Sequence, residues 1–260
     1  MTTRGFGVAS GLDREVALPL AARCEELGYS SLWSNDTPLA KGLDTVADFA
    51  RGADRVDLGV TIAIDRHSPE ELAADIDRLD LDRERLWLAV GAGHSKRSLT
   101  TMREALPALR EALPRVRLAL AAMGPKMCEL AGAAYDGVFL NWMTPAYAAR
   151  SRELVERGAA DASRETPPVL GYVRTAVGTD AEGRLAKEEG FYRRLHKGYS
   201  DHFDRLGEPE GTVGVAAQET GEAQTELSRY DALDTVVVRA LASATLEDMS
   251  ALAEAAAPGD

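Results

Sequence analysis

The stretch ALAAMGPKMCELA, residues 119–131, decides how this chain is expected to fold. Residues 116–123 form a run of small and apolar side chains, which predicts a strand buried on both faces. The run ends at Gly124-Pro125, and residues 126–134 are predicted to be a helix with Pro125 in its first turn. The backbone N–H groups at such a helix start have no partner within the helix, so the turn suits an anion, most naturally a phosphate. An ordinary strand-to-helix turn is the alternative, since every α/β protein contains several.

The same strand-then-helix unit recurs along the whole chain. Short apolar runs predict eight strands, at residues 5–10, 31–35, 56–64, 85–90, 116–123, 137–143, 168–177 and 235–242. An amphipathic helix is predicted after each strand, and residues 181–230 are predicted to be mostly helical, in two or three pieces separated by glycines and Pro209. Eight such units, with no room for a second sheet, predict a single-domain (β/α)8 TIM barrel over residues 1–260. An open, doubly wound sheet is the alternative fold.

Composition narrows the class of partner. The net charge of -12 would repel nucleic acid phosphates and anionic lipid, so we expect neither a nucleic acid nor a membrane as partner. No apolar run reaches about 18 residues, and the N-terminal segment lacks a basic-then-apolar signal. A soluble, cytoplasmic protein is therefore expected. The apolar surfaces of its outer helices would permit a homodimer.

The cysteines and histidines do not form a metal-binding pattern. Cys24 continues an apolar helical series and Cys128 follows the glycine turn, so both are expected to be packed thiols. The sequence has no CxxC pair, and its four histidines are scattered. We therefore expect no metal site.

In a TIM barrel the functional groups lie at the C-terminal ends of the strands. Those ends carry hydrogen-bonding groups, cations and one aromatic ring: Ser10, Asn35, Asp36, residues 61–65, Gly91, Gly93, His94, residues 123–126, Asn141, Trp142, Arg174, Thr175 and Arg239. Together with the phosphate turn, this mixture suits a ligand with a flat, polar-edged ring and a phosphate tail. The simplest such ligand is a flavin-like nucleotide.

Several of these residues have a structural alternative. Asp36 could cap the next helix, His94 could belong to its loop alone, and Trp142 could be part of the core. Arg174 and Arg239 sit within apolar strands, where an unpaired charge would cost several kcal/mol. They must therefore pair with an acid or with an anionic ligand, and the sequence leaves both open.

Longer segments resemble the bacterial luciferase-like monooxygenase superfamily, in a short form. The matching segments are ARCEELGYSSLWSND (residues 22–36), DLGVTIAIDRHSPEELA (57–73), RLWLAVGAG (85–93), LAAMGPKMCELAGAAYDGVFLNWMTP (120–145) and GYVRTAVG (171–178). Barrels of this superfamily use FMN or the deazaflavin coenzyme F420, so the resemblance implies one of these cofactors. It favours F420 slightly, because the short, Ala- and Arg-rich chain resembles that branch.

The resemblance also implies roles for particular positions. Gly124, Pro125 and Lys126 would hold the cofactor phosphate, and Gly91 and Gly93 would line the cofactor. Val60, Thr61 and Ile62 would form a bulge behind the ring, in this family often with a cis non-proline peptide bond. The strand-end residues Ser10, Asn141, Trp142 and Arg174 are further candidates for cofactor binding. Asp36 and His94 are the candidates for proton transfer, since each is a titratable group at a strand end.

Two features depart from the superfamily. Many relatives, especially the deazaflavin-dependent dehydrogenases, have a histidine directly after the aspartate at the second strand end, where this chain has Thr37. The chain is also shorter between strands four and five, which implies a more open site or one closed by a partner subunit.

The sequence thus predicts an oxidoreductase acting on a small organic substrate, by hydride transfer or, with FMN, by monooxygenation. One alternative is a barrel that binds flavin without turnover. Another is a phosphosugar-type TIM-barrel enzyme that uses the same phosphate turn.

Overall fold

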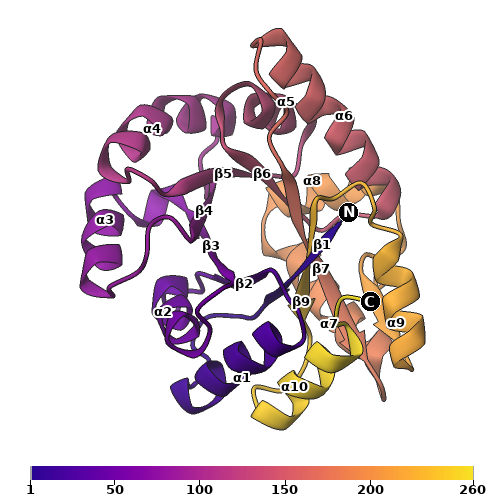
Figure 1. The fold of residues 1–260 in the computed structure, drawn as a ribbon. Helices are drawn as coiled ribbons and strands as arrows, with labels where there is room; N and C mark the ends of the chain where they lie inside the picture. The colour runs from indigo at the N-terminus through magenta and orange to yellow at the C-terminus, as the bar shows by residue number, and fades with distance from the viewer. Residues whose placement is uncertain (1, 260) are drawn as a thin grey trace.

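Eight parallel strands pair side by side around a closed barrel in the computed structural model, which describes residues 2–259 (Figure 1). The barrel strands are β1 (Thr3–Gly7), β2 (Ser31–Asn35), β3 (Asp57–Ala63), β4 (Leu86–Gly91), β5 (Arg117–Ala122), β6 (Gly137–Asn141), β7 (Val169–Val177) and β9 (Thr235–Ala240). Each pairs with the next in this order, and β9 closes the ring on β1. The predicted (β/α)8 TIM barrel is confirmed.

Helices surround the barrel (Figure 1). They are α1 (Arg14–Glu26), α2 (Gly42–Gly52), α3 (Pro69–Arg78), α4 (Ser98–Ala112), α5 (Pro125–Ala134), α6 (Pro145–Asp161), α7 (Ala181–Leu195), α8 (Lys197–Leu206), α9 (Thr220–Ser228) and α10 (Leu246–Ala255), with a 3₁₀ turn at Ile64–Arg66. Local sequence explains several starts: Ser68 forms a capping box with Glu71, and Thr144 caps α6 ahead of Pro145. None of the helices described is long and apolar enough to cross a membrane.

Two parts of the sequence-based assignment around the site differ from the structure. The first strand ends at Gly7, so Ser10 lies in the loop that follows it rather than within the strand. The region 181–230, predicted to be mostly helical, also contains a short strand, β8 (Val215–Ala217). This strand pairs with the end of β7 from Thr175 to Val177, beyond Tyr172, where the pairing of β7 with β6 ends. Three residues are too few for a recognisable alternating pattern, so β8 could not be predicted from hydrophobic periodicity.

The barrel interior is a packed aromatic layer. Trp33, Trp87, Phe139 and Tyr172 form its bulk, and the ring centroid of Phe139 lies 4.5 Å from that of Trp33 and 4.7 Å from that of Tyr172. Gly59 makes this possible, because a Cβ at that position would lie 2.2 Å from the Trp33 ring. A larger cluster, which includes Cys24 and Cys128, lies between the barrel and its helices and confirms that both cysteines are buried thiols. Packed side chains therefore close the barrel interior beneath any site at its mouth.

Candidate functional site at the barrel mouth

The inner face of the barrel carries small residues at the C-terminal ends of β3, β4 and β5. Residues two apart on a strand share a face, so Thr61, Ala63, Gly91 and Ala121 follow the aromatic layer toward the mouth. Ala63 pairs with Gly91 in register, and a Cβ added at Gly91 would lie 3.5 Å from Cβ of Ala121. We call these four residues the small-residue shelf. A shelf of this kind leaves room for a flat ring.

The bulge expected at Val60, Thr61 and Ile62 is not present. The pairing of β3 with β4 is continuous from Leu58 to Ala63, and every peptide bond in residues 2–259 is trans. Val60 and Ile62 point into the core between barrel and helices, so Thr61 alone of the three lies on the inner face. Regular pairing on both sides of β3, with β2 and with β4, leaves no extra residue to form a bulge.

Arg174 lies at the mouth on β7, with only 3% of its surface exposed. One guanidinium nitrogen donates to the side-chain oxygen of Asn141. The guanidinium carbon lies 4.0 Å from the ring centroid of Trp142 and 5.2 Å from that of Tyr192. Burial lowers the pKa of Arg174, since the charged form loses its hydration.

Trp142 is held in an uncommon backbone conformation directly after β6. Its φ is +51°, in the left-handed region that a bulky side chain rarely adopts. Nε2 of the buried His202 lies within hydrogen-bond distance of the Trp142 carbonyl, and the Trp142 ring lies 5.3 Å from that of Phe203. Helix α8 therefore fixes Trp142 beside Arg174. Backbone strain of this kind is concentrated at functional sites.

A second buried cation, Arg239, lies beside Arg174. The two residues are paired in register on β9 and β7, and Arg239 is 6% exposed. The guanidinium carbons of Arg239 and Arg174 lie 5.9 Å and 5.7 Å, respectively, from the centroid of the Tyr172 ring. The one side-chain hydrogen bond of Arg239 within residues 2–259 goes to the carbonyl of Ala240, at 3.1 Å. Within residues 2–259, neither arginine has the acid partner that the sequence left open.

The predicted glycine turn and helix form as expected at the start of α5. Gly124 precedes the helix and Pro125 is its first residue. Met127 and Cys128 donate their N–H groups to the Gly124 carbonyl. The N–H groups of Gly124 and Lys126 have no protein acceptor among the described residues. These two donors are available for an anion.

Arg205 on α8 adds a cation to this helix start. A Cβ added at Gly124 would lie 4.0 Å from Nη2 of Arg205, and the same nitrogen lies 3.4 Å from the Met123 carbonyl. In contrast, Lys126 is exposed and lines an outer groove of about 530 Å³ between α4, α5 and α6, together with Arg103 and Glu129. The cation near the helix start thus comes from a distant part of the sequence.

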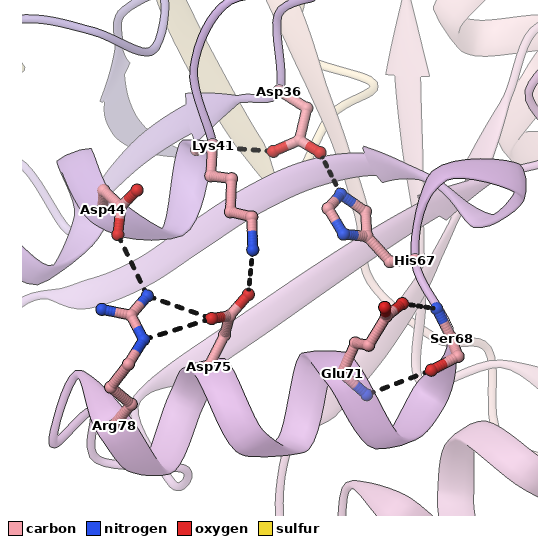
Figure 2. Close-up of polar contacts among 9 residues, drawn as sticks. Asp36, Lys41, Asp44, His67, Ser68, Glu71, Asp75 and Arg78 are labelled. Carbon is pink, nitrogen blue, oxygen red and sulfur yellow. Dashed lines mark hydrogen bonds and ion pairs between the residues drawn. The ribbon is translucent and has the colours of Figure 1, made fainter.

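Asp36 is bound on both carboxylate oxygens. Oδ1 accepts from the N–H of Gly42, the first residue of α2, at 2.8 Å, and Oδ2 contacts Nε2 of His67 (Figure 2). The side chains of Asp36 and His67 are 5% and 9% exposed. Asp36 therefore secures the start of α2, as the capping alternative expected, and also forms a buried pair with His67. His67, together with Lys41 and Asp75, lines a hollow of about 440 Å³ against α3.

His94 lies on the loop between β4 and α4 with 82% of its side chain exposed. Its N–H donates to Oδ2 of Asp65 at 2.8 Å, and its Nδ1 lies 3.1 Å from the same oxygen. Burial opposes ionisation of Asp65, but these contacts outweigh it and lower the pKa of Asp65. The ring centroid of His94 lies 6.0 Å from that of His196, at the junction of α7 and α8. Gly93 allows this loop to form, because its φ is +58° and a Cβ there would lie 1.9 Å from Asp65 Oδ1.

Ser10 and Thr37 hold neighbouring loops together. The Ser10 hydroxyl lies 3.0 Å from both Oγ1 of Thr37 and the carbonyl of Ala40. The Thr37 side chain thus holds the loop after β2 against the loop after β1. Among residues 2–259, no group of three or more His, Cys, Asp or Glu side chains is arranged to hold a metal ion.

A sequence profile described as Luciferase-like monooxygenase matches residues 107–255, more than half of the 260-residue chain. The chain belongs to this family. A comparison with curated protein sequences found no match.

Solved structures of other proteins agree with the family's fold. One is an F420-dependent secondary alcohol dehydrogenase in complex with an F420-acetone adduct, with a TM-score of 0.72, 16% identity and coverage of 98% of this chain and 99% of that one. Another is the coenzyme F420-dependent tetrahydromethanopterin reductase from Methanopyrus kandleri, with a TM-score of 0.74, 15% identity and coverage of 98% and 96%. A third is the FMN complex of the oxygenating constituent of 3,6-diketocamphane monooxygenase, a type II Baeyer-Villiger monooxygenase from Pseudomonas putida, with a TM-score of 0.68, 13% identity and coverage of 99% of both chains.

The sequence analysis missed several residues at the mouth of this luciferase-like barrel. Tyr192, Tyr199 and Arg205 come from α7 and α8, where only an amphipathic pattern was visible. His67 followed the third strand by a few residues, and its position one residue before the Ser68 cap was the available signal.

Proposed function

We propose that this protein is an oxidoreductase that binds a flavin-type cofactor, FMN or F420, at the barrel mouth and transfers hydride to or from a small organic molecule. The combination of two separate features carries the proposal. The small-residue shelf suits a flat ring, and the α5 start, with two free N–H groups and Arg205 beside it, suits the phosphate of the same ligand. The family of the chain supports the same chemistry.

The ring of such a cofactor supplies the hydride chemistry when it is bound. The protein would hold the phosphate with the N–H groups of Gly124 and Lys126 and with the guanidinium of Arg205. Lys126 would add its side-chain charge from the outer side of the turn. The shelf would set the position of the ring above the aromatic layer, which keeps water away from its inner face.

His94 is the better placed of the two candidates for proton transfer. Its ring is exposed at the mouth, and Asp65 contacts Nδ1, which leaves Nε2 directed to other partners. Asp36 has both oxygens in use, so we propose that it acts on the site by holding His67 and the start of α2. Ser10 and Asn141 would contribute by fixing the loop after β1 and the guanidinium of Arg174.

The test is a fluorescence titration with FMN and, separately, with F420. A charge-assisted hydrogen bond contributes about 1.5–3 kcal/mol, so Arg205→Gln should weaken binding of the cofactor about 10- to 100-fold. Gly124→Asp should weaken it further, because it adds a carboxylate beside the helix start. Lys126→Ala should have a smaller effect than Arg205→Gln.

Arg229→Gln is the matched control, since Arg229 is a surface arginine paired with Glu226 on α9. It should bind the cofactor like the wild type. Failure of both cofactors to bind, or equal loss in Arg229→Gln and Arg205→Gln, would overturn the proposal. Stable binding without reduction by any hydride donor would instead indicate a barrel that carries flavin without turnover.

A further inference from the structure

Arg174 and Arg239 are two buried cations that pair with no carboxylate among the described residues. They are in register on neighbouring strands and are 3% and 6% exposed. No carboxylate lies within ion-pair distance of either guanidinium in the part of the chain that the structure describes. Glu188 on α7 is near enough to favour the charged form of Arg174 but forms no ion pair with it. Two such charges side by side repel each other and have lost their hydration.

The tyrosines around this pair do not neutralise it. Burial raises the pKa of Tyr172 and of Tyr199 to about 12, so both phenols are uncharged near neutral pH. The other groups in contact with Arg174 are the rings of Trp142 and Tyr192 and the side-chain amide of Asn141, none of which is a carboxylate.

Two buried donors in the same place also have no acceptor. Nε of Arg174 and Nε1 of Trp142 have no hydrogen-bond partner among residues 2–259. Both groups can only donate. An unsatisfied buried donor is costly, and here two of them accompany two uncompensated positive charges. One kind of ligand, a small anion with several oxygen acceptors, would neutralise the two positive charges and accept hydrogen bonds from the two donors.

We propose that Arg174 and Arg239 form a binding site for a planar oxygen-bearing anion, the carboxylate of the substrate. Guanidinium groups recognise planar carboxylates through paired hydrogen bonds, and the aromatic rings around Arg174 hold its plane in place. Because the two arginines lie across the barrel mouth from the small-residue shelf, the anion would anchor an organic acid beside the cofactor ring. The assignment to a substrate rests on the proposed function, whereas the anion site itself does not.

The test uses the full-length protein without cofactor and follows thermal unfolding in sodium acetate, with acetamide as the neutral probe of the same shape. Sodium chloride at equal ionic strength controls for general salt effects. Acetate should raise the unfolding temperature in a saturable way, and acetamide and chloride should not. Arg239→Gln and Arg174→Gln should each weaken the apparent affinity for acetate at least tenfold.

The unfolding temperature of Arg239→Gln without acetate distinguishes a ligand-binding role of the arginines from a purely structural one. If the arginines are retained for a ligand, Arg239→Gln should unfold at the same temperature as the wild type or higher, because it removes an uncompensated buried charge. Arg85→Gln is the matched control: Arg85 donates to the carbonyls of Ala53 and Val56 at the other end of the barrel. This variant should be less stable and keep the full response to acetate.

Acetate that stabilises the protein no more than chloride, or that stabilises Arg239→Gln as well as the wild type, would overturn the anion site. Repeating the titration on FMN-saturated protein identifies the source of the anion. Acetate binding that adds to FMN binding supports a carboxylate substrate. Competition between acetate and FMN would overturn the assignment to a substrate and would indicate that the two arginines bind the polar edge of the cofactor ring. Cofactor affinity is measured separately, so a failure of the proposed function is distinguishable from a failure of the anion site.

Discussion

The pair of Asp36 and His67 gives the sharpest prediction about the architecture of the site (Figure 2). Both side chains are less than 10% exposed, and Asp36 also accepts from the N–H of Gly42 at 2.8 Å. Replacing Asp36 by alanine leaves the buried His67 ring without its hydrogen-bond partner, an effect worth about 1–3 kcal/mol. It also removes a contact at a helix start, worth about 0.5–2 kcal/mol. These two contributions overlap in part, so we expect a total loss of about 2–4 kcal/mol in the free energy of unfolding.

The assay is urea unfolding followed by circular dichroism. With a slope of about 3 kcal/mol/M, the midpoint should fall by about 0.7–1.3 M urea. A double-mutant cycle with His67→Gln should give a coupling energy of about 1–3 kcal/mol, because the two side chains are in contact. Asp44→Asn is the control, since Asp44 and its partner Arg78 are each 56% exposed and such a pair contributes at most about 1 kcal/mol.

Two results would refute this reasoning. A midpoint within error of the wild type for Asp36→Ala would mean that the buried pair does not stabilise the fold. A coupling energy near zero would mean that Asp36 and His67 act independently. Either result would make the Asp36 carboxylate a candidate for proton transfer again.

Two further predictions concern stability. Burial, and to a lesser degree the charge of Arg205, lowers the pKa of His202 from its ordinary 6.5, so the unfolded chain takes up the proton first as the pH falls. The free energy of unfolding should therefore decrease from pH 7 to pH 5, and urea titrations of His202→Asn should show a flatter dependence; an unchanged slope would contradict this origin. Gly93→Ala should lose more than the about 1–2 kcal/mol of a left-handed backbone, because its Cβ would also collide with Asp65. Gly178→Ala, with φ +86° and open space around it, should lose only the backbone contribution, and equal losses in the two variants would show that the collision is relieved.

The helix starts and strand ends were predictable because they depend on neighbouring residues. The Gly124-Pro125 turn, the Ser68 capping box and the buried strand before the turn each follow from contacts within a few residues. Once eight such units were counted, closure into a barrel followed, since parallel strands joined by helices have few other ways to bury both faces. The strand-end rule then placed Arg174 and Gly91 at the mouth.

The partners of these residues required the tertiary structure. Arg239 is 65 residues from Arg174, and only barrel pairing puts them in register. Arg205 is far from Gly124 in sequence and reaches it because α8 packs against the end of β6. The absence of an acid beside Arg174, among the residues described, is likewise a property of three dimensions. The sequence by itself therefore determined the repeating unit, the barrel and the rim residues, because local hydrogen bonding and hydrophobic periodicity act over short distances. Only the folded chain decided which of those residues meet, because burial and charge pairing depend on distances that the order of residues does not specify.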